Sequence, residues 1–202
     1  MAQVKDPVVR GRGRPEEGAR DAVLEAATEL FVERDFDDVT TEDIIERAGV
    51  SRGALYHHFP GKLDLFRAVY DASERRAMAR IGAAASGAEG PFAVLIAASR
   101  AYLREAESSV ELRRIGIIQS RAVLGWEGWR QAAAELGLGF TRAALAAAME
   151  AGEIKRRDLE TTSHLMLAAL VEGATLIATA EDPAGVRPEV EELVVDLLEA
   201  LR

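Results

Sequence analysis

Apolar residues recur at helical spacing along most of the chain. In residues 16–33 they fall at positions i, i+1, i+4, i+7 and i+8, which predicts an amphipathic helix with one buried stripe. This stripe consists of Val23, Leu24, Ala27, Leu30 and Phe31. No strand pattern appears, only six residues are proline, and alanine, leucine and glutamate recur throughout. The sequence therefore predicts an all-α fold.

Residues 40–59 contain two short helical patterns joined by a turn that is too tight for an ordinary helical hairpin. Thr40 can cap the first helix, and Asp43 follows three residues later, as in a capping box. Gly49 ends this helix, because glycine tolerates the positive φ of a helix stop, and Ser51 can cap the next helix. The pattern predicts a helix-turn-helix.

The second of these helices, residues 52–59, has two different faces. Leu55 and Phe59 are four residues apart and should anchor the helix in the core. The opposite face carries Arg52, Gly53, Ala54, Tyr56 and His57. Its small residues allow close approach to the major groove of DNA, while the longer side chains reach phosphates or base edges. We expect Arg52 and His57 near base edges and Tyr56 on a phosphate.

The run from Leu30 to Leu65 resembles the DNA-binding domain of TetR/AcrR-type transcriptional regulators. The resemblance rests on the turn Ala48-Gly49-Val50-Ser51, the block Leu55-Tyr56-His57-His58-Phe59 and Lys62, and it covers about the first third of the chain. It implies a homodimer that binds double-stranded operator DNA, with Lys62 on the DNA backbone and a divergent effector-binding domain. The expected DNA-binding residues are Arg12, Arg14, Thr40, Thr41, Arg52, Gly53, Ala54, Tyr56, His57 and Lys62.

The charge is unevenly distributed along the chain. The net charge is −9, yet residues 1–15 hold four basic residues against one acidic residue. Residues 8–15 alternate arginine with glycine and have no apolar face, which predicts an arm that is disordered in the free protein. Arg12 and Arg14 could enter the minor groove of A·T-rich DNA, or the arm could be a solubilising tail.

The remaining pattern predicts a connector helix and a helical C-terminal domain. The connector spans residues 62–84, and two glycines and a proline within residues 86–91 mark a boundary. Further helices are expected at residues 92–106, 110–119, 121–151, 161–180 and 189–202. We therefore expect a basic arm at residues 1–15, a three-helix helix-turn-helix domain at 16–70, and a ligand-binding and dimerisation domain at 71–202.

Aromatic residues in the predicted 121–151 helix could line a ligand cavity. Trp126, Trp129 and Phe140 lie on a repeat with steps of three and four, which predicts one buried seam, although aromatics at this spacing also form ordinary core. Polar groups within apolar runs mark further candidates, and Glu172 could meet a cationic ligand, pair across a dimer, or face water. The expected ligand-binding residues are Tyr102, Gln119, Trp126, Trp129, Phe140, His164 and Glu172.

The last helix has a broad apolar stripe for a chain end. A four-helix contact between the last two helices and their symmetry mates would bury this stripe, whereas the alternative is packing onto its own subunit. The expected dimer residues are Leu165, Ala169, Leu176, Val190, Leu193, Val194, Leu197, Leu198 and Leu201.

Composition excludes several classes of function. The chain has no cysteine and three histidines, two of them adjacent, so we expect no metal site. We also expect no cofactor and no enzymatic activity, because Gly-rich phosphate loops and nucleophile motifs are missing from the sequence. No apolar stretch approaches the length that crosses a bilayer, which favours a cytoplasmic protein without membrane contact.

These features together predict a ligand-responsive DNA-binding transcriptional regulator. We expect a repressor that a small, largely apolar or aromatic effector releases from a palindromic operator. The alternative is a helix-turn-helix regulator whose C-terminal domain is controlled by a protein partner. An enclosed cavity near Trp126 and Trp129 would favour the small molecule, since a partner-binding domain would be filled and would expose an apolar patch.

Overall fold

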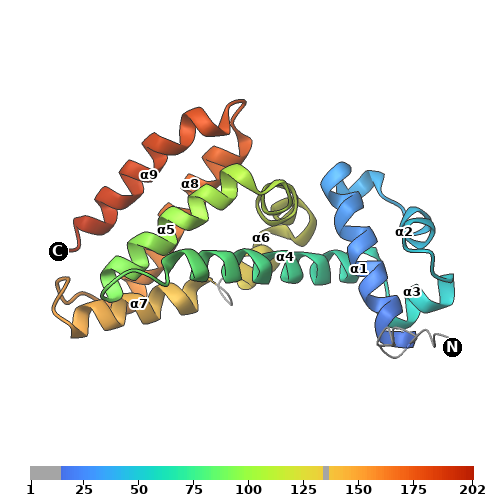
Figure 1. The fold of residues 1–202 in the computed structure, drawn as a ribbon, viewed down its shortest axis with the longest axis horizontal. Coiled ribbons are helices and arrows are strands. Elements are labelled where there is room, and N and C mark those ends of the chain that lie inside the picture. Colours follow the sequence, from blue (N-terminus) through green and yellow to red (C-terminus); the bar gives the residue numbers. More distant parts are fainter. Residues whose placement is uncertain (1–14, 134–136) are drawn as a thin grey trace, which may run out of the picture.

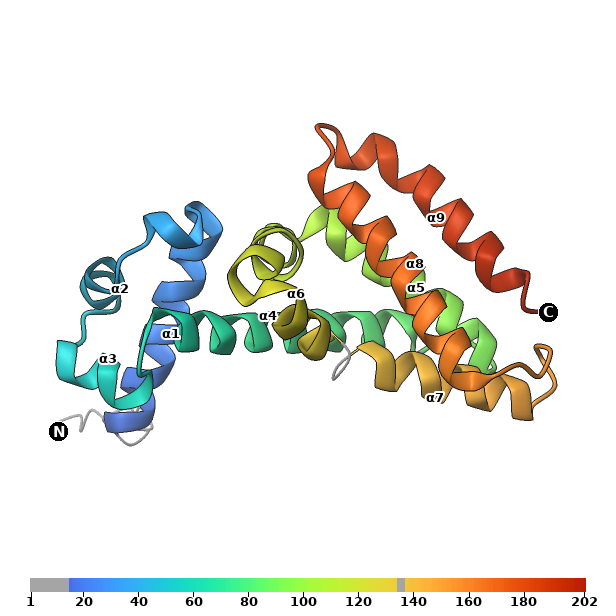
Figure 2. The ribbon, with the colours of Figure 1, turned by 180° about the vertical axis from the view of Figure 1, so that it is seen from behind.

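The computed structural model describes residues 15–133 and 137–202, and these residues form helices and loops without a β-strand (Figures 1 and 2). The elements are α1 (Pro15–Glu33), η1 (Phe36–Asp38), α2 (Thr41–Ala48), α3 (Arg52–His58), α4 (Lys62–Ala85), α5 (Pro91–Ser108), η2 (Leu112–Gln119), α6 (Ser120–Ala133), α7 (Gly139–Glu150), α8 (Leu159–Thr179) and α9 (Pro183–Glu199). The predicted all-α class and N-terminal helix-turn-helix are confirmed.

The helices form two lobes that α4 connects. Helices α1, α2 and α3 lie together at one end of the molecule, and α4 runs from them along the second lobe (Figure 1). The first lobe closes around a core in which Phe31, Leu55 and Phe66 are fully buried or nearly so. The Phe31 and Phe66 rings meet edge to face, with centroids 5.2 Å apart. This small core orients the helix-turn-helix relative to the start of α4.

The second lobe is built around α5, which contacts α4, α7, α8 and α9. The close approach of α8 and α9 depends on Gly173, because a Cβ atom there would lie 2.8 Å from Cγ1 of Val190. Arg187 on α9 binds Glu107 on α5 and, at 2.7 Å, Glu191 on its own helix. Helix α9 is therefore packed against its own subunit as well as facing outward (Figure 2).

The predicted helix at residues 121–151 is wrong as a single element. Gly125 interrupts α6 with φ 70° and ψ 168°, and a separate helix, α7, begins at Gly139. Because the interruption changes the helical phase, Trp126 and Phe140 do not share a buried seam, and they are 70% and 41% exposed. Only the half-buried Trp129 keeps the expected inward position.

The start of the last helix also differs from the prediction. The last helix was predicted at residues 189–202, but α9 begins at Pro183 and contains Pro188. Proline suits a first helical turn because its φ is already helical and its missing N–H would have no partner there. The Asp182 side chain caps this turn by accepting a hydrogen bond from Gly185 N at 3.1 Å.

The sequence analysis expected no apolar stretch long enough to cross a bilayer, and helix α8 differs from this expectation. It has 21 residues and is apolar enough, by length and composition alone, to cross a bilayer. One such helix is weak evidence for a membrane span, because the core helix of a soluble protein passes the same test. Several of its apolar residues lie on the outer face of the second lobe.

Candidate nucleic-acid interface and ligand cavity

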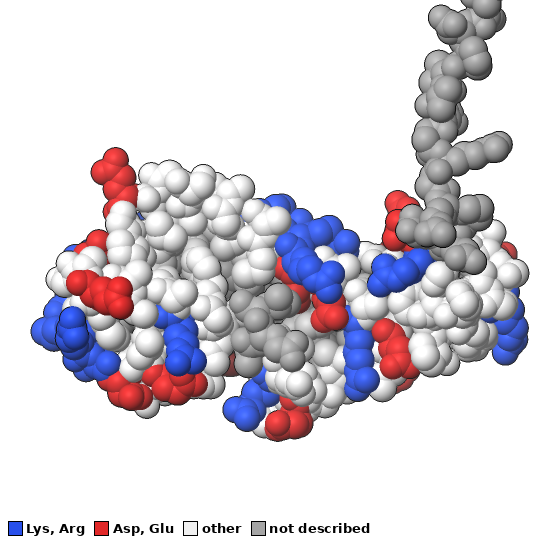
Figure 3. All heavy atoms as spheres, turned by 90° about the horizontal axis from the view of Figure 1, so that it is seen from below, with Lys and Arg blue, Asp and Glu red and all other residues white. Residues whose placement is uncertain are grey.

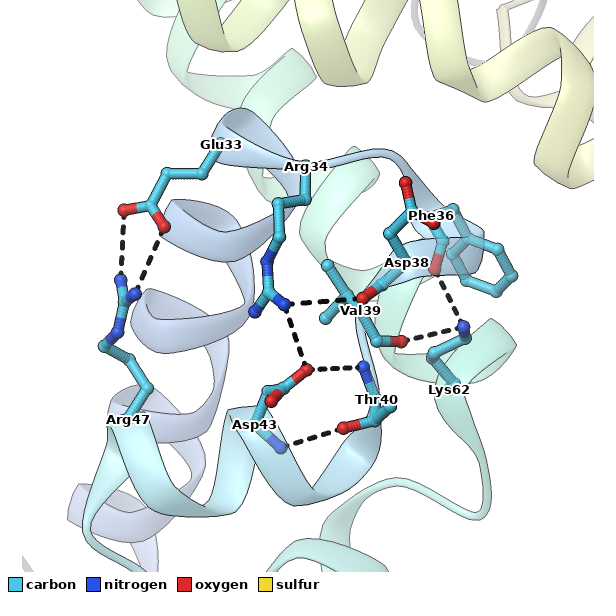
Figure 4. A network of polar contacts seen from close by, with 9 residues as sticks. All are labelled: Glu33, Arg34, Phe36, Asp38, Val39, Thr40, Asp43, Arg47 and Lys62. Carbon is cyan, nitrogen blue, oxygen red and sulfur yellow. Dashed lines mark hydrogen bonds and ion pairs between the residues drawn. The ribbon is translucent and has the colours of Figure 1, made fainter.

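Helix α2 begins with the predicted capping box. The Thr40 hydroxyl accepts a hydrogen bond from Asp43 N at 3.1 Å, and Thr40 N donates to Asp43 Oδ2 at 3.0 Å (Figure 4). These bonds to Thr40, aided by nearby Arg34, lower the pKa of Asp43. Gly49 ends the helix with φ 65°, a left-handed conformation that favours glycine. The turn that positions α3 is thus set by local chemistry.

Helix α3 presents the predicted recognition face to solvent. Its N-terminus is capped by Ser51, whose hydroxyl accepts a hydrogen bond from Ala54 N at 3.2 Å. Leu55 and Phe59 are buried, so the helix is fixed to the core from one side only. On the other side Arg52, Gly53, Tyr56 and His57 are exposed and Ala54 is half-buried.

Four side chains on and beside this surface contact one another. Arg52 forms an ion pair with Glu42 at 3.0 Å, and its guanidinium lies 5.4 Å from the centroid of the Tyr56 ring. The Tyr56 hydroxyl lies 3.3 Å from the hydroxyl of Thr41. This arrangement limits the rotamers of Arg52 and Tyr56 before DNA arrives, and a phosphate or base acceptor would replace Glu42.

Lys62 is placed differently from the sequence expectation. Its Nζ donates hydrogen bonds to the carbonyl oxygens of Phe36 at 2.7 Å and Val39 at 2.8 Å, and it lies 4.2 Å from the centroid of the Phe36 ring (Figure 4). The carbonyls of this η1 turn need partners, and a lysine ammonium supplies three donors. Lys62 therefore fixes the loop before α2, and its predicted phosphate contact stays a prediction.

Charge on the remaining surface is mixed. Figure 3 shows basic and acidic side chains interspersed along one face of the molecule, without a continuous single-sign area on that face. Arg12 and Arg14, the predicted minor-groove residues, lie outside the described residues. Their contact with DNA stays a prediction.

A cavity lies within the second lobe, between α4, α5, η2, α6, α7 and α8. It is open to solvent on one side and spans about 770 Å³ when this opening is included. Aromatic walls are supplied by Tyr70, Tyr102, Trp129 and Phe140, and most of the other lining residues are aliphatic. The polar lining groups are Glu74, Ser99, Arg121, Thr141 and Thr175.

Tyr102, Trp129 and Phe140 line the cavity as the sequence analysis expected, and the other four predicted ligand residues do not. Trp126 lies outside the cavity, because the turn at Gly125 directs it to solvent. His164 pairs with Glu160 at 3.1 Å on the surface of α8. Glu172 is largely exposed and lies 3.9 Å from Arg121.

Gln119 has a structural role instead of the predicted ligand contact. It is buried, and its Nε2 donates to the carbonyl oxygen of Phe31 at 2.6 Å and more weakly to that of Arg34 at 3.5 Å. The preceding turn of η2 adds Arg114, which donates to Val32 O at 3.3 Å and to Asp35 at 2.8 Å. The last carbonyls of α1, which lack helical partners, are thus bound from the second lobe.

Helix η2 consequently contacts both the cavity and the core of the first lobe. Gly116 and Ile117 line the cavity, while Ile115 is buried in the core of the first lobe. This segment is a π-helix, a conformation that is rare and frequently found at functional sites. A molecule in the cavity would contact the same short helix that holds the end of α1.

The sequence analysis missed Glu74, which lines the cavity and is only 8% exposed. Burial, and to a lesser extent Asp71, raises the pKa of Glu74 to about 7. A signal was available, because Glu74 lies on one helical stripe of α4 with Tyr70, Met78 and Ile81, all of which line the cavity. Arg121 was also missed, and it donates to Thr175 Oγ1 at 3.0 Å.

Comparison with known families covers both lobes. Residues 23–69 match the family described as "Bacterial regulatory proteins, tetR family". Residues 92–201, more than half of the chain, match "Tetracyclin repressor-like, C-terminal domain". The chain belongs to the TetR family of transcriptional regulators. TetR-family regulators are DNA-binding transcription factors and not enzymes, and they act on operator DNA as dimers.

Individual relatives are similar over the helix-turn-helix region or over the whole fold. The transcriptional activator FasR of Mycolicibacterium smegmatis is 43% identical over 60 residues, 30% of this chain and 27% of its own length. The repressor BepR of Brucella suis is 46% identical over 50 residues, 25% of this chain and 24% of its own. The matched segment is therefore about a quarter of each relative. A TetR-family structure from Pectobacterium atrosepticum superposes with a TM-score of 0.81 and 28% identity, covering 94% of this chain and 97% of that one.

The predicted dimer residues of this TetR-family chain divide into three groups by burial. Val190, Val194, Leu198 and Leu201 are buried within the subunit, so their assignment to the interface is wrong. Val190 and Val194 face inward where α9 packs closely on α8 at Gly173, and Leu198 and Leu201 are buried in a cluster with Phe92. Ala169 is half-buried. The residues that stay exposed are Leu165, Leu176, Leu193 and Leu197.

Proposed function

We propose that this TetR-family protein is a ligand-released repressor that binds a palindromic operator as a homodimer. The observation that carries the proposal is the shared use of α4 and η2. Both helices supply walls of the cavity, and both also pack against the helix-turn-helix lobe. The divisions that suit this role are residues 1–15 as an arm, 16–70 as the DNA-binding domain and 71–202 as the effector and dimerisation domain.

The DNA-binding part of the proposal rests on the exposed face of α3. Arg52 and His57 would read base edges, and Tyr56 together with Thr40 and Thr41 would contact phosphates. Gly53 has open space around its Cα, where a Cβ would meet only Ser51 Oγ at 3.9 Å. The backbone of α3 can therefore approach the groove floor closely.

Repression would require two recognition helices at the correct spacing. In a dimer they must lie about 34–36 Å apart to enter successive major grooves on one side of DNA. A ligand between α4 and η2 would favour dimers with a different spacing, and it can shift the equilibrium only by its differential affinity for the two states. A coupling of about 1–3 kcal/mol corresponds to a 5- to 150-fold loss of operator affinity.

The exposed leucines on α8 and α9 support a dimer. Leu165 and Leu176 on α8 and Leu193 and Leu197 on α9 are each about half exposed or more. Together they form an outer apolar surface that a second copy could cover in a four-helix contact. Such a contact would also account for the apolar composition of α8.

The alternative, control of the second lobe by a protein partner, receives less support. A domain that binds only a partner protein has no use for an interior cavity, whereas this lobe contains one with four aromatic walls. The aromatic and aliphatic walls of the cavity favour an aromatic or largely apolar effector.

The test begins with selection of the operator from random double-stranded DNA by the full chain. We expect a palindrome whose half-site centres are one helical turn apart. Small aromatic compounds that raise the Tm of the protein are then tested for release of this DNA. The proposal is wrong if the selected sites have no two-fold symmetry, or if compounds that bind the cavity leave operator affinity unchanged.

A further inference from the structure

Glu74 is a carboxyl group inside the cavity without a bonded partner among the described residues. It lines the cavity at 8% exposure, and no described residue donates a hydrogen bond to it. Burying a charged group without a partner is unfavourable, so such a group is retained only where something compensates it. Its position facing a cavity points to a ligand as the missing partner.

The groups around Glu74 suit such a partner. Its carboxyl packs closely against Gly116 on η2, where a Cβ atom would come within 2.6 Å of Glu74 Oε1. Burial and the nearby Glu74 charge raise the pKa of the Tyr70 and Tyr102 hydroxyls, which therefore stay protonated at neutral pH. The site thus combines one acidic group, two hydroxyls and aromatic faces.

The positive charge of Arg121, which also lines the cavity, already has partners. Arg121 is the one basic residue among the described lining residues. Its guanidinium donates to Thr175, lies 3.9 Å from the Glu172 carboxylate, and stacks 4.7 Å from the centroid of the Trp129 ring. A free anion would compete with these contacts, whereas a cation at Glu74 would meet no competitor.

We propose that the cavity binds an aromatic ligand that carries a protonated amine, with the ammonium on the Glu74 carboxylate and the ring against Trp129 and Phe140. This inference rests on the proposed function, because it names the chemical class of the effector of the same cavity. The ammonium also gains from the faces of Tyr70 and Tyr102, which attract cations.

The ionisation of Glu74 gives the pairing a measurable signature. Because the pKa of Glu74 is raised to about 7 in the empty cavity, about half of the molecules hold the proton at pH 7. An ammonium ligand stabilises the carboxylate and lowers this pKa. Binding therefore releases a fraction of a proton, which a neutral ligand does not do.

The test compares ligands that share one ring and differ in one group. The first series is 2-phenylethylamine, 2-phenylethanol and 3-phenylpropionate, and the second is tryptamine, tryptophol and indole-3-propionate. Affinities for the full-length protein are measured by calorimetry at pH 7 in two buffers of different ionisation enthalpy. We expect the amine of at least one series to bind roughly 10- to 100-fold more tightly than its alcohol and to release a fraction of a proton.

Two variants show whether Glu74 is responsible. Glu74→Gln keeps the shape of the side chain and should remove both the preference for the amine and the proton release, while alcohol affinity changes little. Glu89→Gln removes an exposed acidic group that does not line the cavity and should retain both properties. Tm values of both variants report that the fold is intact.

The outcomes test the amine inference and the proposed ligand-controlled release separately. The inference is overturned if no member of either series binds, if an alcohol or acid binds as tightly as its amine, or if the amine preference survives Glu74→Gln. If an amine binds through Glu74 without lowering operator affinity, the ligand class stands and ligand-controlled release is wrong. If a ligand of another class releases the operator, the proposed function stands and the amine inference is wrong.

Discussion

At the scale of single residues, Glu74 couples the stability of the protein to pH. Its pKa of about 7 in the folded state exceeds the ordinary value of 4.5, so the folded state holds the proton more tightly than the unfolded state. The free energy of unfolding therefore falls as pH rises from about 4.5 through 7, by about 3 kcal/mol from this group. The same carboxyl that suits a cationic ligand makes the empty protein less stable above neutral pH.

Glu74→Gln should remove this dependence. The variant is expected to match the original protein at pH 4.5 and to be up to about 3 kcal/mol more stable at pH 8, because the amide stays neutral. Urea unfolding at the two pH values measures the difference. Equal stabilities of the two proteins at pH 8 would show that Glu74 is not desolvated in the folded state.

Substitutions at Arg52 and Tyr56 should affect DNA binding differently, because Arg52 is expected to read a base and Tyr56 to contact a phosphate. Arg52→Ala is expected to weaken binding to the cognate operator by about 1–3 kcal/mol, with a smaller loss on unrelated DNA. Tyr56→Phe should weaken both by a similar factor, because it loses a phosphate contact and its bond to Thr41. Anisotropy titrations on cognate and scrambled duplexes measure both variants. Equal losses on both duplexes for Arg52→Ala would remove it from the base-reading residues.

At the scale of elements, η2 offers a route between the cavity and the DNA-binding lobe that does not pass through α4. Arg114 and Arg113 are neighbours on this helix, yet Arg114 binds Val32 O and Asp35 in the first lobe, while Arg113 donates to Glu107 O in the second lobe. This pair of arginines therefore provides a matched test of the route.

Arg114→Ala should reduce the effect of a ligand on operator affinity while leaving ligand affinity in the absence of DNA unchanged. Arg113→Ala should leave the coupling as it is in the original protein. Operator titrations with and without a saturating ligand give the coupling free energy for each variant. The η2 route would be excluded if both variants retained the full coupling.

What the sequence could reveal differs between elements for physical reasons. Helix caps and stops are local, so Thr40, Gly49 and Ser51 set the helix-turn-helix as predicted. Gly125 interrupts a helix by adopting a positive φ, and the aromatic repeat around it gave no sign of this. The bonds from Gln119 to α1 join residues 85–88 positions apart, which no local pattern could indicate.

At the scale of the whole molecule, the outer surface of α8 and α9 should determine the oligomeric state. Leu193 on this surface is 58% exposed, whereas its neighbour Val194 is buried in the subunit. Leu193→Glu places a charge in the proposed interface without entering the core of the subunit. Val110 is 48% exposed and lies on neither α8 nor α9, so Val110→Glu is a control for an added surface charge.

We expect Leu193→Glu to yield folded monomers with greatly reduced operator affinity, because a monomer engages one half-site only. Val110→Glu should remain dimeric with unchanged operator affinity. Sedimentation equilibrium and circular dichroism measure association and fold. A Leu193→Glu protein that dimerises as strongly as the original chain would mean that another surface forms the dimer.

The central claim is that ligand and operator bind to one protein with opposing preferences, and reciprocity tests it most directly. Ligand affinity, followed through the fluorescence of Trp129 in the cavity wall, is measured with and without saturating operator. A released repressor predicts that the operator weakens ligand binding roughly 5- to 150-fold, the same factor by which the ligand weakens operator binding. Equal ligand affinities with and without operator, or tighter ligand binding in its presence, would contradict the account.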